Sequence, residues 1–136
     1  MTFIYSRTVY LNDTDAAGVV YFASAMQMCH EAYEESLVTA GINLQELIAK
    51  REIAIPITHA EIDFFRTLFC SDRLEIQLTA NQLKDSEFAL AYSIYSLSKP
   101  NKITIKANTK HVCINPQTRT RIPLPETLLQ WITDNC

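Results

Sequence analysis

Two hydrophobic periods follow one another along the first third of this chain. Residues 3–11 alternate between apolar and polar side chains, which predicts a half-buried strand. Its apolar face would contain Phe3, Tyr5, Val9 and Leu11. From about Gly18 to Ala40, apolar residues instead recur every three or four positions, which predicts a long amphipathic helix. Gly41 follows at the place where the end of a helix commonly needs a left-handed residue.

The rest of the chain predicts a short helix, four more strands and a terminal helix. Asn43, with Glu46 three residues later, indicates an N-cap and a helix that ends near Lys50. Compact polar turns separate the last three strands, which should therefore form an antiparallel meander. The further strands are expected at 54–65, 74–83, 87–97 and 103–114, and the terminal helix at 126–135.

This order of elements indicates an α+β protein. The chain has 136 residues, enough for one domain with a substantial core, and no repeat, low-complexity segment or linker divides it. We therefore expect a single domain over residues 1–136.

Composition and charge exclude several classes of partner. The chain is 48% hydrophobic and 20% charged, as in ordinary globular proteins. Its net charge of −3 gives no general attraction to nucleic acid or to an anionic membrane. No apolar run approaches the roughly 20 residues of a membrane span, and the first residues lack the layout of a signal peptide. We expect a cytoplasmic protein with no nucleic-acid partner and no membrane span.

The four cysteines do not indicate a metal site, because they are widely spread and form no C-x-x-C pair. Cys29, Cys70 and Cys113 lie in apolar segments and are expected to be small buried hydrophobic residues. Cys136 is expected to be exposed.

Residues 12–22 carry the most information about chemistry. The segment reads Asn-Asp-Thr-Asp-Ala-Ala-Gly-Val-Val-Tyr-Phe, so Asp15 lies three residues before Gly18. From spacing alone, Asp13 and Asp15 are turn or N-cap residues, a role that Asp fills routinely. The same layout can hold an Asp side chain beside the free N–H groups of a helix start, where negative charge is favoured. An acid at such a site suggests attack on an acyl group.

Other catalytic arrangements find less support in the sequence. There is no G-x-S-x-G elbow and no glycine-rich phosphate loop. A Ser or Cys nucleophile with a His partner stays open, because such groups meet in space rather than in sequence. The three histidines, however, are expected to be structural or surface residues, and the helix carboxylates are secondary candidates expected to be solvated. These residues are His30, His59, His111, Glu31, Glu34 and Glu35.

Residues 12–22 resemble the D-x-D-A-x-G-x-V-Y-(F/H/Y) signature of hotdog-fold acyl-CoA thioesterases of the 4-hydroxybenzoyl-CoA thioesterase type. The element order and the strand residues Ala60–Phe64 also agree with that family. The resemblance implies a hotdog fold, in which an antiparallel sheet of five or six strands wraps around one long central helix. Many relatives carry a Gly-Asp pair where this chain has Cys70-Ser71-Asp72, so the turn there departs from the family pattern.

The resemblance also implies roles for four residues. Asp15 matches the catalytic Asp, which would act as nucleophile or general base. The backbone N–H of Phe22 matches the oxyanion donor at the helix start. Gly18 matches the signature glycine, and Tyr21 the aromatic residue before the donor. No metal or other cofactor is expected.

Within the family, residues 11–15 and 23–31 are most similar to the branch that hydrolyses 1,4-dihydroxy-2-naphthoyl-CoA in phylloquinone (vitamin K1) biosynthesis. The expected partner is therefore an acyl-CoA substrate. Its phosphates could meet surface cations that the sequence leaves unassigned: Arg66, Lys84, Arg119 and Arg121. Relatives form dimers with the site between subunits, often dimers of dimers, so we expect a homotetramer.

Three alternatives remain at this point. One is a thioesterase for 4-hydroxybenzoyl-CoA or short-chain acyl-CoA. Another is a hotdog module that binds an acyl group without hydrolysing it. The third is a hotdog dehydratase, which would need a His general base near the helix start; none follows Asp15 within the motif.

Overall fold

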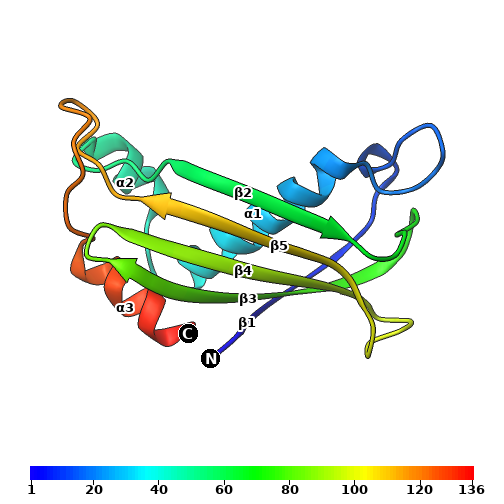
Figure 1. The fold of residues 1–136 in the computed structure, drawn as a ribbon. Coiled ribbons are helices and arrows are strands. Elements are labelled where there is room, and N and C mark those ends of the chain that lie inside the picture. Colours follow the sequence, from blue (N-terminus) through cyan, green and yellow to red (C-terminus); the bar gives the residue numbers. More distant parts are fainter.

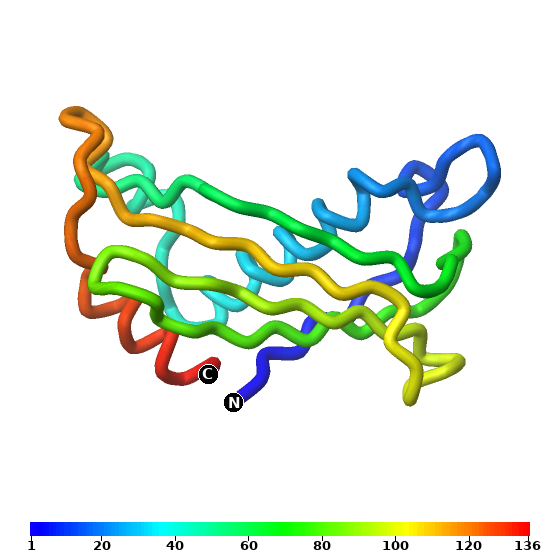
Figure 2. Tube along the Cα trace, viewed as in Figure 1, coloured from blue at the N-terminus to red at the C-terminus, as the bar shows by residue number.

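One antiparallel sheet of five strands lies across a long helix (Figures 1 and 2). The structure is a computed structural model that describes residues 1–136. The strands are β1 (Phe3–Thr8), β2 (Ile57–Phe64), β3 (Arg73–Lys84), β4 (Glu87–Ser96) and β5 (Ile103–Val112). The helices are α1 (Phe22–Thr39), α2 (Leu44–Lys50) and α3 (Glu126–Asp134), with a short 3-10 turn, η1 (Leu11–Asp13), before α1. The predicted α+β class is confirmed, and the sheet has five strands.

The strand order is β1-β3-β4-β5-β2, and every neighbouring pair is antiparallel. The predicted meander of the last three strands is therefore confirmed. The strand order places β1 and β2 at the two edges of the sheet. Every residue of β2 except Ile62 is exposed, so this edge is uncovered in the single chain.

The core lies between α1 and the inner face of the sheet. Strands β3 and β4 alternate between buried and less buried residues, as their sequence period predicts. The inward residues are Leu74, Ile76, Leu78, Ala80, Phe88, Leu90, Tyr92 and Ile94. Helix α3 closes one end of this core through Trp131, whose indole Nε1 donates to Ser36 Oγ of α1 at 3.1 Å.

The predicted short helix with its N-cap, and the left-handed glycine after α1, are confirmed. The Asn43 side chain accepts the backbone N–H of Glu46 at 3.0 Å, which satisfies one of the free donors at the start of α2. Gly41 has φ of +85°, the left-handed conformation expected where α1 ends. None of the helices is long and apolar enough to cross a membrane.

Two expectations about the ends of elements are wrong. Strand β1 stops at Thr8, and Leu11 is 77% exposed, because residues 11–13 turn into the 3-10 helix instead of continuing beside β3. Helix α1 begins at Phe22 rather than near Gly18, because Val19 and Val20 form β-bridges with Phe69 and Thr14.

One expectation about the cysteines is also wrong. Cys70 is exposed, because it lies in the turn before β3 rather than in a strand. Cys29 and Cys113 are buried and Cys136 is exposed, as predicted.

Candidate active site

Residues 13–21, called the motif loop below, form a narrow loop between η1 and α1. Thr14 and Val20 form a β-bridge, and the Asp15 N–H donates to the Val19 carbonyl at 2.9 Å. Gly18 closes the tip by donating its N–H to the Asp15 carbonyl at 3.0 Å, with φ of +81°. That positive φ suits glycine and would strain most other residues. The chain forms a loop here because the left-handed Gly18 lies between Thr14 and Val20, which bridge to each other.

Asp15 lies in the motif loop and holds it together. Its Oδ1 accepts the N–H of Ala17 at 2.8 Å and the N–H of Val19 at 3.4 Å. The turn role expected from spacing is thus observed, whereas Asp15 does not cap α1, whose N-cap residue is Tyr21. The Asp15 residue is exposed, so its carboxylate is both oriented by backbone donors and open to solvent.

The N-terminus of α1 has no side-chain cap. No side chain bonds to it, and its first turn contains no acidic residue. The Tyr21 N–H donates to the Asp13 carbonyl, and the first hydrogen bond of the helix is Ala25 N–H to the Tyr21 carbonyl. The N–H groups of Phe22, Ala23 and Ser24 therefore donate to no group of this chain. Free donors at the positive end of a helix dipole attract an oxyanion or a polarised carbonyl oxygen.

A partly buried ion cluster adjoins the motif loop. The Arg7 guanidinium donates to Asp13 Oδ2 at 2.5 Å and to Glu31 Oε1 at 2.8 Å, and its side chain is only 9% exposed. The Tyr5 hydroxyl also donates to Glu31, at 3.1 Å. Burial and the nearby Glu31 charge raise the pKa of Tyr5. Glu31 is therefore not simply solvated as expected, because it is paired and its side chain is 32% exposed, whereas Glu34 and Glu35 are exposed as expected.

Sequence reasoning missed Arg7, although the sequence holds a signal for it. In β1, Arg7 has the same parity as Phe3, Tyr5 and Val9, the residues predicted to face inward. A charge on an apolar face is rarely buried without a partner. The acids of the motif loop and of α1 are the partners that such a charge requires.

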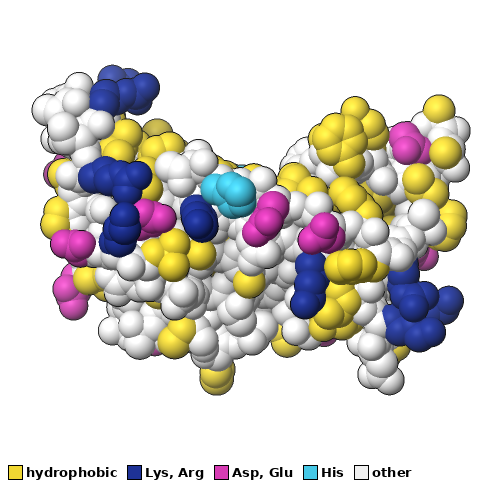
Figure 3. Space-filling view, in the orientation of Figure 1, with side chains coloured by type: hydrophobic (Ala, Val, Ile, Leu, Met, Phe, Trp, Pro, Cys, Tyr) yellow, Lys and Arg dark blue, Asp and Glu magenta, His cyan; other side chains and the backbone are white.

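Exposed apolar side chains surround the motif loop. Figure 3 shows hydrophobic side chains gathered at this end of the molecule. The exposed residues here include Leu11, Tyr21, Phe22, Phe64, Phe65 and Phe69. A small groove of about 180 Å³ lies between Val19–Val20 and Phe64–Leu68, and it includes Arg66, one of the unassigned cations. Arg121 is instead paired with Glu87 at 3.1 Å.

A second groove lies farther along α1. It has a volume of about 310 Å³ and is lined by Met26, Gln27, Cys29, His30, Ile57, Tyr92 and Thr109. Tyr92 and Thr109 form its floor from the sheet, and the pKa of Tyr92 is raised above its usual range by burial. Because a helix rises about 1.5 Å per residue, Met26 lies roughly 6 Å along α1 from Phe22.

Behind this groove, His111 is a buried structural residue. Its Nε2 is 2.8 Å from Thr109 Oγ1, and its ring stacks on Phe88 with centroids 4.8 Å apart. Burial lowers the pKa of His111 to about 4, with the charge of His30 as a smaller cause. Its Nδ1 has no hydrogen-bond partner. His30 and His59 are exposed, and none of the three histidines is hydrogen-bonded to a Ser or Cys side chain.

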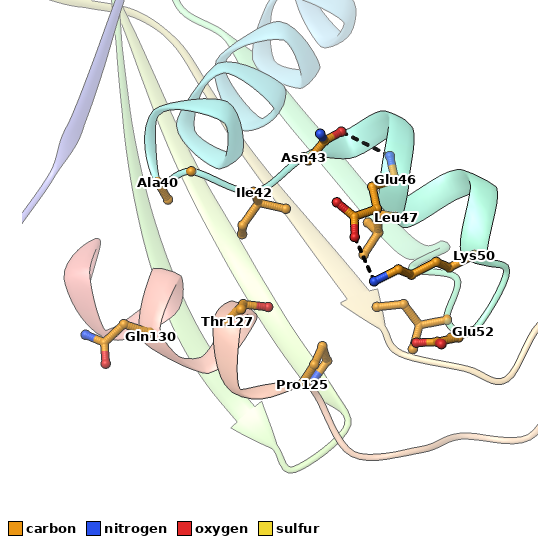
Figure 4. A pocket seen from close by; sticks show the side chains of 12 residues that line it. Ala40, Ile42, Asn43, Glu46, Leu47, Lys50, Glu52, Pro125, Thr127 and Gln130 are labelled. Carbon is orange, nitrogen blue, oxygen red and sulfur yellow. Dashed lines mark hydrogen bonds and ion pairs between the residues drawn. The ribbon is translucent and has the colours of Figure 1, made fainter.

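The cleft between α2 and α3 is separate from the motif loop. It has a volume of about 480 Å³, and its wall includes the Glu46–Lys50 ion pair at 2.7 Å (Figure 4). The two helices lie at the opposite end of the molecule from the motif loop (Figure 1). No group of three or more His, Cys, Asp or Glu side chains is arranged to hold a metal ion.

Comparisons with known proteins agree with this architecture. The family model of the thioesterase-like superfamily matches residues 9–132. A 1,4-dihydroxy-2-naphthoyl-CoA hydrolase of Gloeothece citriformis (strain PCC 7424) is 57% identical over 129 residues, which are 95% of this chain and 90% of that protein. The protein of the same name from Rippkaea orientalis (strain PCC 8801 / RF-1) is 55% identical over 128 residues, with 94% and 93% covered.

A solved structure shows the same similarity in three dimensions. The crystal structure of Slr0204, a 1,4-dihydroxy-2-naphthoyl-CoA thioesterase from Synechocystis, superposes with a TM-score of 0.94 at 43% identity. The match covers 98% of this chain and 97% of that one. The resemblance to hotdog thioesterases inferred from residues 12–22 is confirmed, and the chain belongs to the thioesterase-like superfamily.

Proposed function

We propose that residues 1–136 form one thioesterase domain that hydrolyses 1,4-dihydroxy-2-naphthoyl-CoA to 1,4-dihydroxy-2-naphthoate and CoA. This substrate assignment is supported by the 55–57% identity, over nearly the full length of both chains, to two hydrolases of that name. The pathway would then be phylloquinone biosynthesis, and the cytoplasmic location expected from the sequence stays a prediction.

In the proposed mechanism, the thioester carbonyl oxygen accepts the backbone N–H of Phe22. That N–H has no partner in the chain and lies at the positive end of α1. As negative charge develops on the oxygen, the hydrogen bond strengthens. One such donor is worth ~10²–10³ in rate in well-studied enzymes.

Asp15 supplies the second part of the mechanism. As a general base, it takes a proton from a water molecule whose oxygen attacks the carbonyl carbon. The tetrahedral intermediate then collapses, the C–S bond breaks, and the CoA thiolate leaves and takes up the proton. As a nucleophile, an Asp15 carboxylate oxygen instead attacks the carbonyl carbon, the C–S bond breaks to release the CoA thiolate, and water then hydrolyses the acyl anhydride to free acid and the Asp15 carboxylate. The Ala17 and Val19 N–H groups orient the same carboxylate in both routes.

Gly18 and Tyr21 support this arrangement from within the motif loop. Gly18 permits the positive φ at the tip, and Tyr21 ends the loop directly before Phe22. The groove beside Met26, Cys29 and Tyr92 offers an apolar surface for the aromatic acyl group. It begins about one helical turn from Phe22, within reach of a ring attached to a carbonyl at that N–H.

We also propose a homodimer that pairs through the β2 edge, and a dimer of dimers as the full assembly. The support is that β2 is an unpaired edge strand with apolar residues exposed on it and beside it, at Ile57, Phe64 and Phe65. Exposed edges and apolar patches of this kind are normally covered in stable proteins. The motif loop lies near Phe64 and Phe65, so the partner would help to enclose the site.

A thiol-release assay with purified protein tests the substrate. The panel contains 1,4-dihydroxy-2-naphthoyl-CoA, 4-hydroxybenzoyl-CoA, benzoyl-CoA, phenylacetyl-CoA and short aliphatic acyl-CoA. We expect kcat/KM to be highest for the naphthoyl thioester by a wide margin. Equal or faster turnover of an aliphatic thioester would contradict the naphthoyl assignment but not thioesterase activity. Binding without turnover of any thioester would instead indicate the acyl-binding alternative.

A further inference from the structure

The geometry points to Arg7 as a positioning residue that holds the motif loop in register with α1. This inference rests on the proposed function, in which Asp15 and the Phe22 N–H act on the same thioester. Arg7 touches neither of them. It acts through Asp13, the first residue of the motif loop, whose carboxylate binds the Arg7 guanidinium.

Arg7 joins three separate elements. It extends from β1, and one of its terminal nitrogens binds Asp13 at the start of the motif loop while the other binds Glu31 in α1. The ring of Tyr10 covers the guanidinium, with Arg7 Cζ 5.7 Å from the ring centroid. A guanidinium can bind two carboxylates in fixed directions, which a lysine ammonium cannot do equally well.

Asp13 passes this constraint to both ends of the motif loop. Its carboxylate is held by Arg7 and by the Tyr10 N–H at 2.8 Å. Its carbonyl accepts the N–H of Tyr21 at 2.9 Å, and Tyr21 immediately precedes the proposed oxyanion donor. Asp13 is also two residues before Asp15. Arg7 therefore fixes, through one residue, the segments that carry both catalytic groups.

Glu31 connects the ion cluster to α1. It lies two to three turns into α1, on a helix whose other face packs into the core. Binding Arg7 to Glu31 thus ties the motif loop to the rigid body of the helix rather than only to an edge strand. Because catalysis depends on placement to within about 1 Å, a loss of this tie should reduce kcat more than substrate binding.

The test compares Arg7→Gln and Arg7→Lys with Lys50→Gln. Lys50 also pairs with a glutamate, Glu46, at 2.7 Å, but it lies in α2, at the opposite end of the molecule from the motif loop. Each variant is assayed for kcat and KM on the best thioester, for assembly by light scattering, and for amide hydrogen exchange across residues 13–21. Glu31→Gln, which keeps an amide oxygen for Arg7 and Tyr5, serves as a milder second variant if Arg7→Gln folds poorly.

If Arg7 positions the loop, kcat in Arg7→Gln should fall by about 10-fold to 100-fold while KM changes by less than about threefold. Exchange of the Tyr21 amide should become faster, and Arg7→Lys should recover only part of kcat. Lys50→Gln should match the wild type in all of these measurements.

Two results separate the possible failures. An active wild type whose kcat and loop exchange are unchanged in Arg7→Gln would overturn the positioning role and leave the proposed function intact. A wild type that hydrolyses no thioester would overturn the proposed function. In that case unchanged Tyr21 exchange in Arg7→Gln would overturn the tie between Arg7 and the loop as well.

Discussion

The carbonyl oxygen of Asp13 accepts the N–H of Tyr21 at 2.9 Å, which ties together the two ends of the motif loop. The same residue binds Arg7 through its carboxylate, and that side chain is only 13% exposed. Asp13 and Asp15 are therefore not equivalent acids. Asp13 is tied to the framework through its carboxylate and its carbonyl, whereas Asp15 is exposed on the loop that this framework supports.

Asp13→Asn should destabilise the protein. Asn retains an oxygen for the Tyr10 N–H but loses the charge that pairs with Arg7, which leaves a largely buried guanidinium with one carboxylate. We expect a loss of about 1–3 kcal/mol in the free energy of unfolding, measured by urea denaturation. Asp85→Asn, an exposed change in the β3–β4 turn, should lose almost nothing. Equal stability of the two variants would contradict the framework role of Asp13.

Stability should fall as the pH drops from about 6.5 to about 4 because of His111. Burial lowers its folded pKa to about 4, below the value of about 6.5 in an unfolded chain. In that window the unfolded chain binds more protons than the folded one, so acid favours unfolding. The contribution is on the order of 3 kcal/mol across the window.

His111→Gln should therefore flatten the dependence of unfolding free energy on pH between 6.5 and 4. His59→Gln is the matched control, because the His59 side chain is 50% exposed. Parallel curves for the wild type and His111→Gln would show that His111 does not carry this dependence.

The assembly should depend on the β2 edge. Light scattering at micromolar concentration should show no significant monomer of the wild type. Phe64→Lys places a charge on the exposed apolar end of β2, which disfavours edge-to-edge pairing. We expect this variant to shift toward monomer, while Ile48→Lys, which changes an exposed residue of α2, should not weaken the dimer. A wild type that is a stable, active monomer would contradict the shared site.

Regular elements and their faces could be predicted from the sequence, because burial imposes a period that the residues display. The alternation Leu74-Ile76-Leu78 is of this kind, and the N-cap Asn43 could be predicted from its residue type and from Glu46 three positions later. The start of α1 could not, since residues 18–21 continue an apolar pattern although two valines form bridges with other segments. The side-chain geometry at Arg7 depends on three elements meeting, and no local pattern encodes that meeting.

The candidate site divides in the same way. The resemblance of residues 12–22 to the family signature identified four candidate residues, whose roles remain predictions: Asp15, Gly18, Tyr21 and Phe22. Residue spacing could not show that the first N–H groups of α1 lack partners, because this depends on which donors the Asp13 and Asp15 carboxylates bind in the folded loop. Both aspartates of the motif bind other donors, and this leaves the helix end free.

The turnover of Asp15→Asn tests the central claim most directly. The amide oxygen of Asn can still accept the Ala17 and Val19 N–H groups, so folding and assembly should persist with a stability change of at most about 1 kcal/mol. Asp72→Asn is the matched control, since Asp72 also accepts a backbone N–H in an adjacent turn, from Phe69 at 2.8 Å.

The measurement is kcat for thioester hydrolysis by correctly assembled wild type, Asp15→Asn and Asp72→Asn. Asn cannot act as a nucleophile or general base at neutral pH, so kcat of Asp15→Asn should fall by ~10² or more while Asp72→Asn stays close to the wild type. Turnover by Asp15→Asn at the wild-type rate would contradict the account, because Asp15 would then be only a residue of the turn.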